Sequence, residues 1–340
     1  MKRQIIGVVA LLMGLAGTGA LGAAPAPRTP IKVLIVDGFS NHDWKQTTLL
    51  VKNILENTGM FAVTVSTATG MADDTAWDPG FDQYAVVIQN TNNIQNPALR
   101  WPRKIELELE DYVRRGGGLY ILHSANNAFP NWEEYNKMIG LGWRSRETGY
   151  ALQLDSGDHV IRIPPGEGEG TNHGDRFDAV IKILTRHPIN QGYPDQWKTA
   201  SMELYRYARG PAENLTILSA ATDSVTGKRW PVEWVVRYGK GNVYVSSMGH
   251  LWKGDTYPVS YRCIGFRTTL IRATEWLATG RVTYPVPGDF PTKGHTSLVA
   301  LPRAAVMERA AGMAGAVGPA AHATLPNTVS KTLSKTNSSR

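Results

Sequence analysis

The sequence contains very little cysteine, because Cys263 is the single cysteine among 340 residues. A fold held together by disulfides is therefore excluded. Charged residues make up only 19% of the chain and hydrophobic residues 42%, which excludes a collagen-like, a coiled-coil or a wholly disordered chain. Cys263 lies within an apolar helical pattern, so we expect its thiol to be buried and unpaired.

Long apolar runs are also scarce, and the run at the N-terminus has the features of a secretory signal. Lys2 and Arg3 precede an apolar stretch over residues 5–21, and small residues follow it. Residues 5–22 contain five glycines, and the apolar stretch is of marginal length for a membrane anchor. We therefore predict a signal peptide over residues 1–24, an exported mature chain (periplasmic or extracellular), and no stable membrane span after cleavage.

The net charge of +7 comes mostly from the two ends of the chain. Lys2 and Arg3 lie at the N-terminus, and residues 295–340 contain five basic residues and one acidic residue. The net charge between these ends is therefore only +1, and we expect no nucleic-acid partner. Residues 295–340 are rich in Ala, Ser, Thr and Gly, which predicts a disordered low-complexity tail.

Between the ends, short apolar runs alternate with helical patterns. Residues 31–36 are typical of a buried strand, and residues 46–58 have the apolar spacing of a helix that stops at Gly59. Further strands are expected at residues 61–66, 84–88, 119–122, 215–220, 232–237 and 243–247, and further helices at 102–115, 131–139 and 261–278. This order predicts one α/β domain over residues 31–285, doubly wound, with a mostly parallel sheet flanked by helices.

Two segments carry more local expectations. Asn131 and Glu134 have the spacing of a capping box at the start of a short helix. Residues 164–170 are rich in Gly and Pro, so we expect residues 140–180 to be a long loop around one or two weak strands. Long loops in compact domains are usually either functional or disordered.

Three of the eight histidines follow predicted strands. His42 lies in the loop after the first strand, His123 directly follows the fourth, and His250 follows a late strand. Because ligands bind at the carboxyl ends of strands in open parallel sheets, we expect these side chains to meet at one edge of the sheet. A structural role is open for each, such as helix capping for His42 or a buried hydrogen bond for His123. His187 precedes Pro188 and is expected to shape a turn.

Several short motifs resemble the trehalose-utilisation (ThuA-like) family, in the family's order. They cover residues 41–44, 115–125, 187–194, 203–205, 209–214 and 238–250. The resemblance implies a class I glutamine amidotransferase-like, flavodoxin-like sandwich and a link to carbohydrate metabolism. Amidotransferases place a nucleophilic cysteine where this chain has His123, so we expect no glutaminase activity. His250 resembles the position of their catalytic histidine.

The resemblance also brings Glu203 into the candidate site. Relatives often have an acidic residue just before it, where this chain has Met202. Relatives of the secreted type often carry a second histidine after the one that matches His173, and here Arg176 lies nearby.

The first functional hypothesis is an enzyme that acts on a sugar or keto-sugar by acid–base chemistry, because imidazole exchanges protons near neutral pH. Its catalytic residues would be His42, His123, Glu203 and His250. An isomerase, a lyase and a hydrolase all remain open. Binding of the small carbohydrate is expected from aromatic faces and side-chain amides, namely Trp44, Asn92, Asn93, Asn126, Tyr205 and Trp252.

Three alternatives remain beside it. The same cluster, with His42, His123, His173 and His250 as candidates, contains acceptable ligands for a divalent metal. The chain also fits a carbohydrate-binding protein without catalytic activity. Ser124 as a hydrolase nucleophile is disfavoured, because no G-x-S-x-G pattern surrounds it. The sequence leaves the cofactor and the oligomeric state open.

Overall fold

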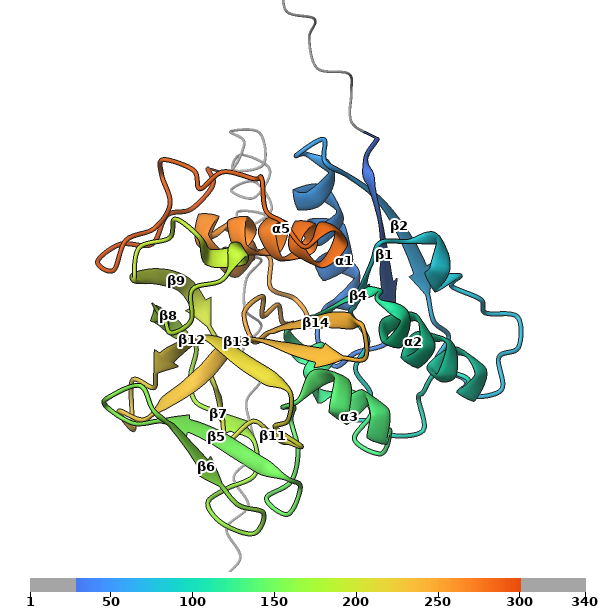
Figure 1. Cartoon of the computed structure of the whole chain (residues 1–340), viewed down its shortest axis with the longest axis horizontal. Helices are drawn as coiled ribbons and strands as arrows, with labels where there is room; N and C mark the ends of the chain where they lie inside the picture. The colour runs from blue at the N-terminus through green and yellow to red at the C-terminus, as the bar shows by residue number, and fades with distance from the viewer. Residues whose placement is uncertain (1–28, 301–340) are drawn as a thin grey trace, which may run out of the picture.

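The computed structural model describes residues 29–300 (Figure 1). Its helices are α1 (Trp44–Glu56), α2 (Arg103–Arg115), α3 (Glu133–Ile139), α4 (Val259–Arg262) and α5 (Ile264–Thr279), with short 3₁₀ helices η1 (Phe81–Gln83), η2 (His123–Asn127) and η3 (Pro188–Asn190). Within residues 29–300, none of these helices has the length and apolar character needed to cross a membrane. The predicted signal peptide and residues 301–340 of the predicted tail lie outside the described residues.

A twelve-stranded mixed sheet forms the centre of the molecule. Its strands are β1 (Ile31–Asp37), β2 (Phe61–Thr67), β3 (Val86–Gln89), β4 (Gly118–Leu122), β5 (Tyr150–Leu154), β6 (Val160–Ile163), β8 (Phe177–Ile183), β9 (Gln196–Met202), β11 (Arg209–Gly210), β12 (Leu215–Thr222), β13 (Arg229–Tyr238) and β14 (Gly241–Ser246). Strands β7 (Asn172–His173) and β10 (Tyr205–Arg206) form a separate antiparallel pair.

The sheet has a parallel half and an antiparallel half. The order β2-β1-β3-β4-β14 is parallel throughout, and β13, β12, β8 and β9 continue from β14 with antiparallel pairings. The fold is therefore α/β, with a central parallel region flanked by helices, which confirms the predicted class. The antiparallel extension was not predicted by the sequence patterns.

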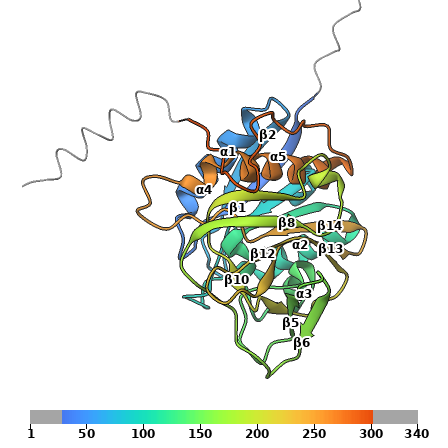
Figure 2. The same cartoon turned by 90° about the vertical axis from the view of Figure 1, so that its left-hand side faces the viewer.

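Side chains of the parallel strands alternate between the two faces of the sheet, and this explains why helices cover both faces. Val33 and Ile35 of β1 belong to a core that contains α1 and α5 residues, whereas Leu34 and Val36 belong to a second core with α2 and α3. Successive side chains of a strand point to opposite faces, so a continuously apolar strand needs a helix layer on each side. Figure 2 shows α1 and α5 on one side of the sheet and α2 and α3 on the other.

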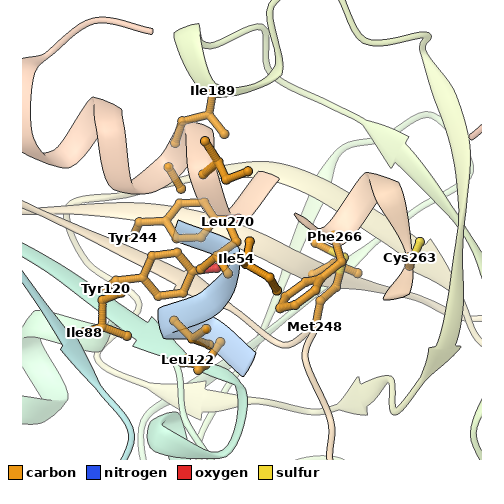
Figure 3. Packing of buried hydrophobic residues seen from close by; sticks show 14 of the residues in the cluster. Ile54, Ile88, Tyr120, Leu122, Ile189, Tyr244, Met248, Cys263, Phe266 and Leu270 are labelled. Carbon is orange, nitrogen blue, oxygen red and sulfur yellow. The ribbon is translucent and has the colours of Figure 1, made fainter. Parts of the chain in front are cut away.

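Aromatic packing makes the sheet rigid beneath α5. Tyr120 of β4 and Tyr244 of β14 lie side by side with ring centroids 4.8 Å apart, in the same cluster as Ile54 of α1 and Leu270 of α5 (Figure 3). All four are buried, and each fully buried large apolar side chain contributes about 1.5–3 kcal/mol. The strand ends that carry the candidate histidines are thus anchored in a close-packed core.

Residues 140–180 contain more regular structure than the sequence predicts, namely strands β5 to β8. The fully buried Arg209 explains the order of the Gly-rich segment, because its guanidinium donates to the backbone carbonyls of Gly149, Pro164 and Glu169. The predicted capping box is absent, since α3 begins after Trp132 and no side chain caps its first turn.

The predicted last helix is two helices, α4 and α5, separated at Cys263, whose backbone is extended. Its thiol is buried and free, as expected. Cys263 forms a β-bridge with Leu298, and Val299 donates its backbone N–H to Arg262. The part of the predicted tail that the structure describes, residues 295–300, is therefore hydrogen-bonded to the domain.

Candidate functional site

Three histidines lie close together, each in the segment that follows a strand of the parallel half. His42 lies between β1 and α1, His123 opens η2 directly after β4, and His250 follows β14. The rings of these three residues lie with centroids 5.1–5.2 Å from one another. The expectation that they meet at one edge of the sheet is confirmed.

Local backbone geometry sets two of these positions. His123 has a φ of 44°, a left-handed conformation that is uncommon for a residue other than glycine and often marks a functional turn. Gly249 has a φ of 96°, and a Cβ there would lie 3.0 Å from Phe266. A glycine is therefore needed directly before His250 for the chain to turn past α5.

The segment after β9 supplies a carboxylate, and the separate β7–β10 pair supplies a fourth histidine. Glu203 lies between β9 and β10, and His173 in β7 pairs with Tyr205 in β10. The carboxylate oxygens of Glu203 lie 3.5 Å from Nε2 of His123, 3.4 Å from Nε2 of His250 and 3.3 Å from Nε2 of His173.

These side chains form a compact, buried cluster that we call the His/Glu cluster: His42, His123, Glu203 and His250. One potential ligand atom from each lies within 4.8 Å of all the others, and all four residues are buried. In the described residues, Nε2 of His42 is buried without a hydrogen-bond partner. This spacing suits a single small ion better than a sugar ring.

The electrostatics of the cluster keep its members in ligand-competent forms. Burial and the neighbouring His123 and His250 lower the pKa of His42 to about 2, and burial with the neighbouring His123 lowers the pKa of His250 to about 3. Burial alone would raise the pKa of Glu203, but the neighbouring imidazoles of His123, His250 and His173 lower it to about 2. At neutral pH, His42 and His250 are therefore uncharged and Glu203 is ionised.

Aromatic residues surround the cluster on its open side. The indole of Trp252 is 45% exposed, stacks parallel to His250 and meets His42 edge-on at 5.0 Å. The side chain of His173 is 40% exposed and contacts Trp143, which also packs against Tyr205. Trp143 was not predicted, because it lies in an irregular segment without any recognisable pattern.

The predicted substrate-binding residues have different surroundings. The Tyr205 hydroxyl lies 3.3 Å from Nε2 of His123, and both side-chain atoms of the buried Asn126 lack partners among the described residues. Asn93 bonds the backbone of Leu99 and Phe129. Asn92 is bonded to Asn41 and to the backbone of Ile94, and Trp44 begins α1 beneath the Lys45 ammonium. Their roles toward a substrate stay predictions.

Other candidate residues have structural partners. His187 accepts a hydrogen bond from the N–H of Ile189 and shapes the turn at η3, as expected. Glu233 in β13 is buried and accepts hydrogen bonds from Ser219 and Tyr244. Ser124 is buried in η2.

The fold and the His/Glu cluster define an α/β sandwich protein with a histidine-rich centre at its strand ends. A family model described as trehalose utilisation (ThuA) matches residues 32–277, which is most of the chain. The chain therefore belongs to the ThuA family, and the predicted resemblance is confirmed.

One solved structure supports this membership, and two others are more distantly similar. The chain is similar to a ThuA-like protein from Parabacteroides merdae, with 32% identity, coverage of 80% of this chain and 98% of that one, and a TM-score of 0.74. A ThuA-like protein from Bacteroides uniformis has 15% identity, coverage of 76% and 98%, and a TM-score of 0.49. A glutamine amidotransferase from Thermotoga maritima has 10% identity, coverage of 65% and 76%, and a TM-score of 0.36. A search of curated proteins found no match.

Proposed function

We propose that this protein is an exported, metal-dependent enzyme that acts on a carbohydrate, with the His/Glu cluster as its divalent-metal centre. The observation that carries the proposal is the convergence of donor atoms from three histidines and one glutamate within 4.8 Å. Imidazole nitrogens and a carboxylate suit zinc and other first-row divalent ions. Export is predicted from residues 1–24, and the substrate is proposed to be a small carbohydrate.

The pKa values favour a ligand role over unassisted acid–base catalysis. An efficient general acid or base has a pKa near the working pH, whereas the pKa of His42 is about 2 and that of His250 about 3. The same neutral imidazoles offer lone pairs to a cation. Leaving Nε2 of His42 buried and unpartnered costs about 1–3 kcal/mol, and a bound ion would supply the missing partner.

The substrate would lie over the cluster rather than within it. Trp252, which is 45% exposed and lies beside His42 and His250, can pack against the apolar face of a sugar ring. The family description, trehalose utilisation, supports a carbohydrate as the substrate. A divalent ion, when bound, supplies Lewis acidity toward a carbonyl or hydroxyl oxygen.

The chain's own residues would then hold the ion and orient the substrate. Glu203 provides the negative charge that balances part of the ion's charge, and the indole of Trp252 limits how a ring can approach. The Tyr205 hydroxyl, at 3.3 Å from His123, is placed to donate a hydrogen bond inside a water-poor site.

The test uses the purified full chain. We expect about one bound divalent ion per chain by elemental analysis after dialysis against Zn²⁺, and turnover of trehalose or a keto-sugar, followed by NMR, that stops on chelation and returns with metal. A His42→Ala variant should lose the ion, while His159→Ala, which alters an exposed histidine bonded to Asp155, should keep it. Absence of a bound ion in the wild type, or turnover that survives complete metal removal, would overturn the metal assignment. Sugar binding without turnover would favour a non-catalytic binding protein.

A further inference from the structure

The hydrogen bonds around the cluster divide its histidines into two kinds. Nδ1 of His42 lies 2.9 Å from Oδ1 of Asn41, and Nδ1 of His123 lies 2.7 Å from the backbone oxygen of Ser247. An oxygen of this kind only accepts, so Nδ1 of each ring must carry the hydrogen. In the neutral ring, Nε2 then carries a lone pair instead of a hydrogen. Nε2 of His42 has no partner among the described residues, and Nε2 of His123 can accept from the Tyr205 hydroxyl 3.3 Å away.

The orientation of Asn41 is fixed by its own neighbours. The backbone N–H of Ile94 donates to Oδ1 of Asn92 at 2.9 Å, so the amide nitrogen of Asn92 must face the other way. That nitrogen donates to Oδ1 of Asn41 at 2.7 Å, and the same oxygen accepts from His42. A chain of three hydrogen bonds, which begins at a backbone N–H that can only donate, therefore selects the tautomer of His42.

His250 has the opposite arrangement. Its Nδ1 lies 3.4 Å from a guanidinium nitrogen of Arg176, and a guanidinium only donates. Nδ1 of His250 must therefore accept, and the hydrogen of the neutral ring lies on Nε2, which faces a carboxylate oxygen of Glu203 at 3.4 Å. Asp255 holds Arg176 in place at 3.5 Å.

We propose that the metal ligands are Nε2 of His42, Nε2 of His123 and the Glu203 carboxylate, and that His250 is not a ligand but a hydrogen-bond donor to Glu203, positioned by Arg176. This inference rests on the proposed metal centre. Two histidines and one carboxylate are a ligand set that leaves coordination positions open for substrate, as catalytic centres require. Hydrogen bonds from ligand imidazoles to carbonyl oxygens are the usual outer shell of such sites.

His173 shares the first arrangement, since its Nδ1 lies 2.7 Å from the backbone oxygen of Gly174. It lies on the exposed side, however, and the group whose donor atoms all lie within 4.8 Å does not include it. The ligand set therefore ends at His42, His123 and Glu203.

The first experiment reads the tautomers directly. Long-range ¹H–¹⁵N NMR of the imidazoles in the metal-free full chain should show the hydrogen on Nδ1 of His42 and His123 and on Nε2 of His250. A hydrogen on Nδ1 of His250 would overturn the inference. This readout does not need bound metal or activity.

The second experiment measures Co²⁺ and Zn²⁺ affinity by competition with a chromophoric chelator. We expect His42→Ala and His123→Ala to lose more than about 100-fold in affinity, because replacing an outer-shell partner alone typically costs 10–100-fold. His250→Ala removes an outer-shell partner of Glu203, so it should lose about 10–100-fold and less than either ligand variant. If His250→Ala loses as much affinity as His42→Ala, His250 is a ligand and the inference fails, whereas the proposed metal centre stands.

Arg176 offers a matched pair of variants at a half-exposed position. The amide oxygen of Arg176→Gln can accept from Nδ1–H of His250, which would turn the Nε2 lone pair toward the metal. We expect the Co²⁺ d–d absorption to weaken as the coordination number rises, whereas Arg176→Lys, which only donates, should keep the wild-type spectrum. Identical spectra for wild type and Arg176→Gln would contradict the positioning role. A wild type that binds neither ion would overturn the proposed function together with this inference.

Discussion

Two glutamates are buried in this molecule, and they differ in what surrounds them. Glu203 follows β9 and lies among the imidazoles of His123, His173 and His250. Glu233 lies in the middle of β13 and accepts hydrogen bonds from the hydroxyls of Ser219 and Tyr244.

Burial alone would raise the pKa of both carboxyl groups. The imidazoles lower the pKa of Glu203 to about 2, whereas the two hydroxyls compensate only in part and the pKa of Glu233 stays above its ordinary value. A buried carboxyl is therefore not by itself the sign of a cation site. The neighbours decide whether it keeps the charge that a cation needs.

The largest expected effect is on metal affinity, which should depend on Glu203 and not on Glu233. Glu203→Gln should weaken Zn²⁺ binding about 1,000-fold, since it removes the only carboxylate of the cluster and outer-shell changes alone cost 10–100-fold. Glu233→Gln is the matched control and should leave the affinity within about twofold of the wild type. Chelator competition on both variants measures this, and equal affinities would remove the contrast drawn between the two regions.

The two halves of the sheet also differ in how well the sequence predicts them. His42, His123 and His250 follow apolar, β-branched strands that must lie parallel under two helical layers, so their meeting was predictable from topology. Glu203 was reached through its motif alone. Its strand β9 (Gln196–Met202) was not predicted, because it mixes Lys198, Thr199 and Ser201 with apolar residues and has no continuous apolar run.

The directions of the hydrogen bonds are even harder to predict from the sequence. Asn92 was predicted to bind substrate, yet in the structure its amide orients Asn41. Arg176 was noted only as a departure from relatives, and its contact with His250 joins residues 74 positions apart. Such contacts depend on side-chain geometry that no local pattern encodes.

The second expected effect is a loss of folding stability when Glu233 is replaced. Glu233→Leu leaves the hydroxyls of Ser219 and Tyr244 without their acceptor, which should lower the free energy of unfolding by roughly 2–6 kcal/mol, at 1–3 kcal/mol for each unsatisfied group. Glu233→Gln keeps an acceptor and should lose less than about 1 kcal/mol. Urea unfolding followed by tryptophan fluorescence tests this, and Zn²⁺ affinity should not change in either variant. A Leu variant as stable as the wild type would mean that the hydroxyls have other partners.

The smallest expected effect uses His187, which is partly buried and has no charged neighbour that shifts its pKa. Burial alone lowers its pKa to about 4, compared with about 2 for His42, where neighbouring imidazoles add to burial. The unfolded chain, with a histidine pKa near 6.5, then binds the proton more readily than the folded chain. The contribution of His187 is therefore fully present above about pH 6.5 and is lost as the pH falls toward 4.

His187→Asn removes this titration and keeps an acceptor for the Ile189 N–H, because asparagine is a good N-terminal cap. We expect its free energy of unfolding to fall less steeply than that of the wild type between pH 6.5 and 4, and the two curves to run parallel above pH 7. Urea titrations at several pH values measure the slopes. Identical slopes would show that burial alone does not shift a histidine in this fold, and the low pKa of His42 would then have to come from its neighbours.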